Sequence, residues 1–195
     1  MEAIQAQTDQ QLILAYLDGD DYAFEVLLNR HRDKIYTSIY LFVKDHSQAD
    51  DIFQEVFIKI VDTLRRGKYN HEGKFVQWAM RISYNLCVDH FRRNKRRPIV
   101  NTKKEDFDIF DVLKSPNASA EDVMIKSQTH AKVRELVDAL PPEQREVVIL
   151  RHYADLSFKE IAALTRVSIN TALGRMRYAL INIRKMVAKR EMVLQ

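Results

Sequence analysis

Apolar residues recur at intervals of three and four along much of the chain, which is the period of an amphipathic α-helix. The clearest run covers residues 24–42, and a shorter helix is predicted before it, at Asp9–Leu17. The same period marks residues 47–64 and residues 75–97. The polar segment Arg65–Lys74, which contains two glycines, separates these last two helices. Residues 1–97 therefore predict one small helical domain.

Polar residues and prolines predict where these helices begin and end. Gly19-Asp20-Asp21 has the composition of a turn followed by an N-cap, and Ser47 with Asp50 three residues later resembles a capping box. Pro98 stops the helix that precedes it. Residues 98–122 show no sustained period and contain two prolines and several acidic residues, so they are interpreted as a linker.

The helical period returns at Val123, which predicts a second helical domain over residues 123–195. Pro141-Pro142 interrupts this period, and Pro142 suits the first turn of a new helix. The pattern as a whole predicts an all-α fold, with two small helical domains joined by a flexible linker.

The segment Leu156–Leu180 predicts two helices joined by a tight turn, Thr165-Arg166-Val167. Ser157 and Glu160 form an S-x-x-E capping box for the first helix, and Ser168 can cap the second. The apolar positions of the second helix are Ile169, Ala172, Leu173 and Met176, and its polar ones include Asn170, Thr171, Arg175 and Arg177. This arrangement is typical of a helix-turn-helix, in which polar side chains read base edges in the major groove. An ordinary helical hairpin with a polar outer face is the alternative.

Charge is unevenly distributed along the chain. Residues 1–58 carry 4 basic and 11 acidic side chains, whereas residues 59–104 carry 13 basic and 3 acidic ones. Residues 105–122 are again acidic, and residues 123–195 carry 13 basic and 7 acidic side chains. Two basic blocks separated by an acidic one predict two polyanion contacts; solvated helix faces are the alternative.

The sequence offers little for catalysis or metal binding. With only 4 glycines there is no phosphate-binding loop, and the 6 histidines show no paired ligand spacing. His31 lies on an apolar stripe and is interpreted as a packed side chain. The single cysteine, Cys87, fits a reducing compartment, and neither a signal peptide nor a membrane-length apolar run is present. We therefore expect a cytoplasmic protein with no cofactor, no metal, no membrane insertion and no enzymatic activity of its own.

Two helix faces in the first domain have opposite character. Arg81, Asn85, Val88 and Arg92 share one face of the helix at 75–97, next to the basic run FRRNKRR and a loop bearing Tyr69, Asn70 and His71. Such a face suits a nucleic-acid strand, with cations on the phosphates and the loop on an unstacked base. The helix containing DDIFQEVF instead combines Asp51, Gln54 and Glu55 with Phe57 and Ile58, which favours a protein partner.

The stretches QADDIFQEVFIKIVDTL, FVQWAMRISYNLCVDHFRRNKRR and LPPEQREVVILRHYADLSFKEIAALTRVSINTALGRMRYAL resemble, in this order, the extracytoplasmic-function (ECF) sigma factors of the sigma-70 family. The resemblance covers nearly the whole chain. It implies a factor that binds core RNA polymerase, through the β′ clamp helices and the β subunit, and directs promoter recognition, melting and transcription initiation. Promoter DNA is then a second partner, and an anti-sigma factor is a third candidate. A stand-alone helix-turn-helix repressor or activator is the alternative.

The resemblance also assigns roles to residues. The helix that binds the polymerase clamp corresponds to Asp50, Asp51, Gln54 and Glu55. The loop and helix that capture and melt the −10 element correspond to Lys68, Tyr69, Asn70, His71, Arg81, Asn85, Asp89, Arg92 and Arg93. Thr171 and Arg175 correspond to positions of the −35 recognition helix, which we extend to Ser168, Asn170 and Arg177.

The sequence departs from the family pattern at two places. Arg166 stands in the turn where many members have glycine, and Leu173-Gly174 stands where many have a basic and a small polar residue. The family also implies that the linker occupies the channel of the polymerase through which RNA leaves. The linker residues Glu105, Asp106, Asp108 and Asp111 are then expected either to mimic RNA there or only to keep a spacer solvated.

Overall fold

The computed structural model describes residues 2–70, 73–95 and 132–189, and the chain divides into two compact units, Met1–Lys104 and Glu105–Gln195. Within the described ranges all regular structure is helical and no strand occurs, which confirms the predicted all-α class. The predicted linker at residues 98–122, the start of the second domain at Val123 and the acidic cluster lie outside the described residues.

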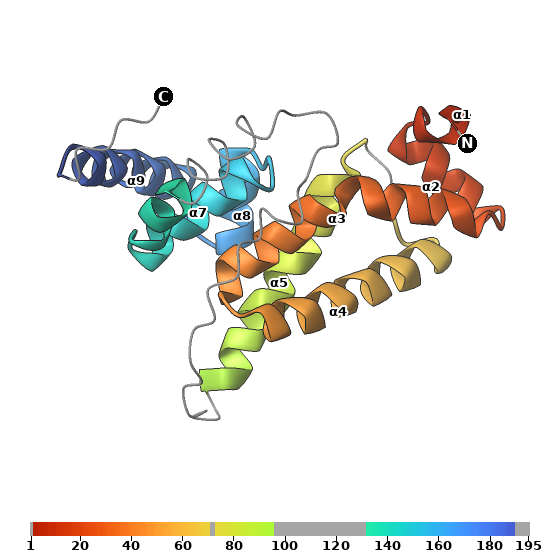
Figure 1. Cartoon of the computed structure of the whole chain (residues 1–195), viewed down its shortest axis with the longest axis horizontal. Helices are drawn as coiled ribbons and strands as arrows, with labels where there is room; N and C mark the ends of the chain where they lie inside the picture. The colour runs from red at the N-terminus through yellow and green to blue at the C-terminus, as the bar shows by residue number, and fades with distance from the viewer. Residues whose placement is uncertain (1, 71–72, 96–131, 190–195) are drawn as a thin grey trace, which may run out of the picture. The chain divides into compact units, whose positions relative to one another are not determined.

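Four of the five helices described in the first unit agree closely with the predicted ones, while α1 was not predicted (Figure 1). They are α1 (Glu2–Gln5), α2 (Asp9–Leu17), α3 (Asp21–Val43), α4 (His46–Arg65) and α5 (Phe75–Lys95). The bounds of α2 and the start of α5 coincide with the predicted residues. The predicted end of the last helix, at residue 97, lies beyond the described part of the chain.

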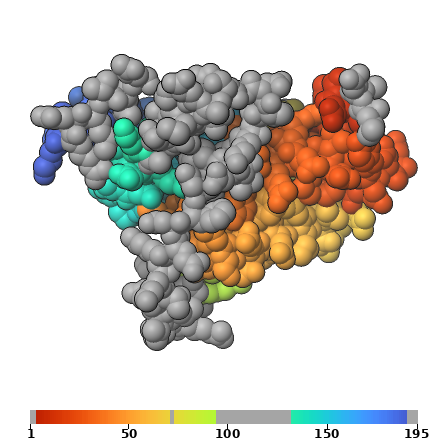
Figure 2. All heavy atoms as spheres, in the orientation of Figure 1, coloured from red at the N-terminus to blue at the C-terminus, as the bar shows by residue number. Residues whose placement is uncertain are grey.

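The core of the first unit forms where α3, α4 and α5 pack against one another, while α2 packs on α3 (Figure 1). Its fully buried aliphatic side chains include Leu27, Ile35, Ile39, Ile60, Leu64 and Met80. Burying one such side chain stabilises a fold by roughly 1.5–3 kcal/mol, so this seam dominates the stability of the unit. In the space-filling view, atoms of α3 and α4, in orange to yellow, form part of the visible surface (Figure 2).

The buried side of α5 is wider than the sequence predicts. The helical period predicts a buried stripe made of Phe75, Trp78, Ala79, Ile82 and Leu86. Trp78 and Ile82 are only half-buried, however, whereas Met80, Tyr84 and Cys87 are buried. The reason is that α5 contacts both α3 and α4, so it needs two adjoining apolar stripes rather than one.

Polar contacts hold α2 against the rest of the unit. Asp9 at the start of α2 accepts from Arg30 at 2.7 Å and lies 2.9 Å from the Nε2 atom of His31. Burial lowers the pKa of His31, although Asp9 opposes that shift. At the other end, Arg65 of α4 donates to the Tyr16 hydroxyl at 2.9 Å. His31 is therefore a packed side chain, as predicted, which also anchors α2.

The ends of α3 and α4 show one success and one error of the sequence analysis. Asp20 caps α3, as predicted, by accepting from the backbone N–H groups of Tyr22 and Ala23. The capping box predicted at Ser47 and Asp50 is wrong. Asp45 caps α4 instead, accepting from the backbone N–H of Gln48 at 2.9 Å, because α3 ends at Val43 and the next helix begins almost immediately.

The second unit is built around a helix-turn-helix. Residues 132–138 are helical, and α7 (Pro142–His152), α8 (Phe158–Thr165) and α9 (Ile169–Lys189) follow. Pro142 opens α7, and the capping box at α8 is confirmed: Ser157 Oγ accepts from the Glu160 N–H at 3.3 Å, and the Ser157 N–H donates to the Glu160 carboxylate at 2.8 Å. Buried Val137, Leu140, Val148 and Ala179 join these helices.

Arg166 forms the turn between α8 and α9 with a left-handed backbone, φ 58° and ψ 42°. Its N–H donates to the Ala162 carbonyl, which closes α8. A residue with a Cβ is strained in this region of φ, whereas glycine is not. The departure from glycine noted in the sequence therefore has a structural cost.

We predict that Arg166→Gly will stabilise the second unit by about 1 kcal/mol, because it removes the steric strain at positive φ. Arg166→Ala is the control: it removes the same charge and keeps the Cβ, so it should give no such gain. Urea denaturation of the full chain, followed by circular dichroism, measures both. Equal midpoints for the two variants would show that the turn is not strained.

Candidate nucleic-acid and protein interfaces

The outer face of α4 is acidic with apolar neighbours. Asp50, Asp51 and Gln54 are exposed and Glu55 is half-exposed, and Glu55 lies 3.6 Å from Lys59. The buried residues Ala49, Ile52, Val56 and Ile60 occupy the opposite side of this helix. These four polar residues thus share an accessible face, as their spacing predicts.

Apolar groups border this acidic face. Ile58 is 65% exposed, and Phe57 is half-buried with its ring 4.5 Å from that of Phe53. Nearby, burial and a hydrogen bond with Asp50 raise the pKa of Tyr36 to about 12. Carboxylates beside an exposed aliphatic group are repelled by DNA and suit a protein surface with basic and apolar groups.

The outer face of α5 carries the opposite charge. Arg81, Asn85, Arg92 and Arg93 are exposed, and Arg92 lies 3.5 Å from Asp89 in an exposed pair. Such an exposed pair holds the side chains only weakly, so Arg92 can turn to another anion. The helix therefore presents guanidinium groups and one amide along a single side, an arrangement suited to a phosphate backbone.

The loop before α5 is held by aromatic packing. Lys68 and Asn70 are exposed, but the Tyr69 ring lies 4.4 Å from that of Trp78 and 6.2 Å from that of Phe75. Burial raises the pKa of Tyr69 to about 12. The Tyr69 ring thus anchors the loop rather than offering a bare stacking surface. His71 lies outside the described residues.

The N-terminal end of α9 is polar and projects from the helix-turn-helix. The Ser168 hydroxyl accepts from the Thr171 N–H at 3.0 Å and lies 2.8 Å from the Thr171 hydroxyl, so Ser168 caps the helix as predicted. Asn170, Thr171 and Arg177 are exposed. Because Ser168 and Thr171 are engaged with each other, Asn170 and Arg177 are the more accessible of these polar groups.

Arg175 lies differently from its predicted neighbours. It is half-buried and donates to Glu146 of α7 at 3.5 Å, with both side chains 25% exposed. Further along the same contact, Asn182 donates to Gln144 at 2.8 Å. These two bridges fix α9 against α7. To reach a base, Arg175 would have to leave Glu146, so the geometry favours a positioning role for it.

The predicted apolar side of α9 is partly wrong. Ala172 is buried and Met176 packs on the core, but Ile169 is 46% exposed and Leu173 is 44% exposed. The buried stripe runs instead through Ala172, Met176, Ala179 and Ile183, and residues 169 and 173 lie beside it.

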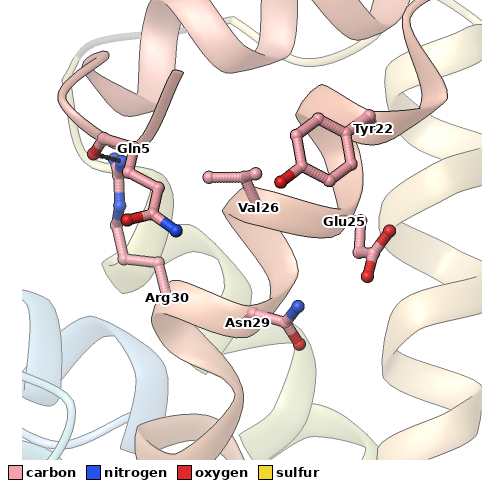
Figure 3. Close-up of a pocket in the computed structure, with 6 residues that line it drawn as sticks. All are labelled: Gln5, Tyr22, Glu25, Val26, Asn29 and Arg30. Carbon is pink, nitrogen blue, oxygen red and sulfur yellow. Dashed lines mark hydrogen bonds between the residues drawn. The ribbon is translucent and has the colours of Figure 1, made fainter. Parts of the chain in front are cut away.

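The described residues contain no cluster of three or more metal-binding side chains. No described helix has the length and apolar character to cross a bilayer. Figure 3 shows a pocket of about 300 Å³ lined by Gln5, Tyr22, Glu25, Val26, Asn29 and Arg30. Arg30 is held there by the Gln5 carbonyl at 2.9 Å, and the pocket contains none of the predicted site residues.

Comparisons with known proteins agree with this arrangement. Residues 27–97 match the Sigma-70 region 2 family and residues 130–177 match the Sigma-70 region 4 family. The chain is 31% identical over 173 residues to the RNA polymerase sigma-H factor of Pseudomonas aeruginosa, covering 87% of this chain and 88% of that protein. It is 27% identical over 172 residues to the ECF RNA polymerase sigma-E factor of Escherichia coli, covering 86% and 88%.

Solved structures share the fold. The sigma factor RpoE of Bartonella quintana, solved with the anti-sigma factor NepR, has a TM-score of 0.61 at 15% identity, over 85% of this chain and 96% of that one. CnrH, solved with the cytosolic domain of CnrY, has a TM-score of 0.60 at 20% identity, over 94% and 99%.

Two matched regions in the expected order, on a chain whose described regular structure is all helical and includes a helix-turn-helix, define a transcription initiation factor. The chain belongs to the extracytoplasmic-function sigma factors of the sigma-70 family. It binds core RNA polymerase and directs promoter recognition and initiation, rather than acting as a stand-alone repressor.

The contact between Arg175 and Glu146 generates a test of positioning. In a double-mutant cycle with Glu146→Ala and Arg175→Ala, we expect a coupling free energy of about 0.2–1 kcal/mol, since both side chains are only partly buried and water weakens their attraction. Urea denaturation of the second unit measures it. Strictly additive effects of the two substitutions would show that the pair does not hold α9 in place.

Proposed function

We propose that the two units divide the work of promoter recognition, with each exposed helix face serving one partner. The observation that carries this proposal is the opposite charge of two helices in one small unit, with acidic α4 and cationic α5 each exposing a polar side. One face suits a protein and the other suits DNA, so a single rigid unit can hold DNA on the polymerase.

The acidic face of α4 binds the β′ clamp helices of core polymerase. Asp50, Asp51, Gln54 and Glu55 supply the polar contacts, and exposed Ile58 supplies an apolar one at their edge. Complementary charge speeds association and sets the orientation of the complex, while the apolar group contributes buried area. An anti-sigma factor that covered this face would keep the protein from the polymerase.

The outer face of α5 and the preceding loop bind the melted −10 element. Arg81, Arg92 and Arg93 neutralise phosphates, and Asn85 adds an uncharged donor and acceptor. Asp89, beside Arg92, orients that guanidinium. In the loop, Lys68, Asn70 and His71 surround an unstacked base, while Tyr69 holds the loop against Trp78.

The N-terminal end of α9 reads the −35 element as duplex DNA. Asn170, Thr171 and Arg177 face the major groove, Ser168 fixes the first turn, and Arg175 positions the helix through Glu146. Arg and Asn side chains distinguish guanine and adenine by paired hydrogen bonds. The protein makes and breaks no covalent bond; the polymerase does the chemistry, and both act in the cytoplasm.

The core-binding face generates the first functional prediction. We expect Asp51→Lys with Glu55→Lys to abolish co-purification with core polymerase, because the reversed charges replace attraction with repulsion. Both side chains are exposed or half-exposed, so the fold should persist. The control is Glu25→Lys with Asp33→Lys on α3, an equal charge change at two exposed sites off this face. Retained binding by the α4 variant would exclude α4 as the core interface.

The polar N-terminal end of α9 generates the second functional prediction. We expect Arg177→Ala to lose discrimination at one base pair of the −35 element by about 1–3 kcal/mol, since a bidentate contact is lost. Arg184→Ala, an exposed arginine two turns further on, should instead weaken binding evenly across sequences and flatten its salt dependence. A competition assay with holoenzyme and single-base promoter variants compares the two. The same profile for both would mean that Arg177 contacts only the backbone.

A further inference from the structure

The outward side of α9 contains a glycine, Gly174, that neither the backbone conformation nor close packing within the chain explains. Gly174 is the sixth of the 21 residues of α9, inside the helix and without a positive φ, and a Cβ added there would meet nothing within 4 Å. The three other glycines of the chain adopt positive φ, which explains them. A glycine inside a helix lowers its stability relative to alanine, so Gly174 has a cost and no compensating contact in the chain.

The neighbours of Gly174 indicate what approaches it. Asn170 and Arg177 lie one turn before and one turn after it, on the same side of α9, and both are exposed. The buried stripe through Ala172 and Ala179 occupies the opposite side. Gly174 is therefore at the middle of the polar surface proposed to face the DNA. A missing side chain at that point allows the helix backbone to come closer to whatever lies opposite.

Leu173 is the second unusual feature of this surface. Its side chain is 44% exposed to solvent, although an apolar core is present in the same unit. It lies next to Gly174 and one helical turn from both Ile169 and Arg177. In the major groove the thymine 5-methyl group is the one apolar feature of the base edges, and aliphatic side chains pack on it. A leucine between Asn170 and Arg177 is placed to make that contact once the helix lies close.

We propose that Leu173 is a specificity-determining residue that packs on a thymine methyl group of the −35 element, and that Gly174 is the point where α9 approaches the base edges most closely. The inference rests on the proposed −35 function of α9, and it adds that Leu173 recognises a thymine. The upstream sequence is then read through two polar side chains, Asn170 and Arg177, and one apolar one.

The test uses holoenzyme assembled from core polymerase and the full chain. Its probes are duplex promoters that the holoenzyme recovers from a pool with a randomised upstream element. In each recovered promoter, every upstream thymine is replaced in turn by deoxyuridine, which lacks only the 5-methyl group. At one position we expect the wild-type holoenzyme to bind about fourfold more weakly, from the loss of one buried methyl. Holoenzyme with Leu173→Ala should bind the thymine and the deoxyuridine promoter equally well at that position, because the side chain that contacts the methyl group is gone.

The matched control is Leu180→Ala on the same helix. Leu180 is 47% exposed and lies seven residues beyond Leu173, roughly 10 Å along the axis. It should retain the full deoxyuridine effect. A methyl effect of equal size in wild type and Leu173→Ala, no methyl effect at any thymine, or a recovered element without thymine would each overturn the proposal.

Gly174→Ala gives an independent readout. In the full chain without DNA or polymerase, the melting temperature of the second unit should rise by about 4–8 °C, because alanine favours the helix. Binding of the same promoters should nevertheless fall several-fold, since the new methyl keeps α9 out of the groove. Unchanged promoter affinity would overturn the close approach.

The proposed function is tested separately by Asn170→Ala with Arg177→Ala. If this double variant recovers the same upstream elements as wild type, α9 does not read the −35 element, and the inference fails with that function. If the double variant loses upstream selection while deoxyuridine has no effect on wild type, the function stands and only the role of Leu173 is wrong.

Discussion

A helix can bury only one side of its surface, and α3, α4 and α5 each bury that side in the apolar seam where the three helices meet. Ile39, Ile60 and Met80 have at most 1% exposure there. Because the seam fixes how each helix is rotated about its own axis, it also fixes which residues of α4 and α5 face outward. The acidic face of α4 and the cationic face of α5 are thus the sides of these helices that the apolar contact leaves exposed, and a substitution in that contact would reorient both faces together.

The second unit follows the same rule with fewer residues. Its core includes the fully buried Leu136, Ile149, Leu150 and Ile161, and polar bridges supplement it. The contacts of Arg175 with Glu146 and of Asn182 with Gln144 join α9 to α7, while Arg151 donates to the Leu156 carbonyl at 3.0 Å between α7 and α8. The two bridges to α7 give α9 a defined orientation, which the proposed reading of bases by its side chains requires.

Local features of this fold were predictable from the sequence because they depend on residues close in the chain. The capping box at Ser157, the span of α2 and the proline start of α7 all follow from neighbouring residues. The N-cap of α4 was missed because Asp45 and Ser47 are both good caps, and the choice depends on where α3 ends.

Features that depend on distant residues were less predictable. Arg175 looked like a base reader on the helix alone, and its pairing with Glu146, 29 residues earlier, needed the three-dimensional contact. Leu173 was counted as apolar and hence buried, although only the packing of α7 decides which apolar residues of α9 turn inward. The widened buried side of α5 has the same origin, since two neighbouring helices cover it.

The single thiol of this chain, Cys87, is buried on α5. Cys87 is 1% exposed, and burial raises its pKa to about 12. Oxidants such as peroxides attack the accessible thiolate, and at neutral pH the folded unit presents neither the charge nor the access. An oxidant would therefore have to react with another protein, which would then act on this one by binding to it or dissociating from it.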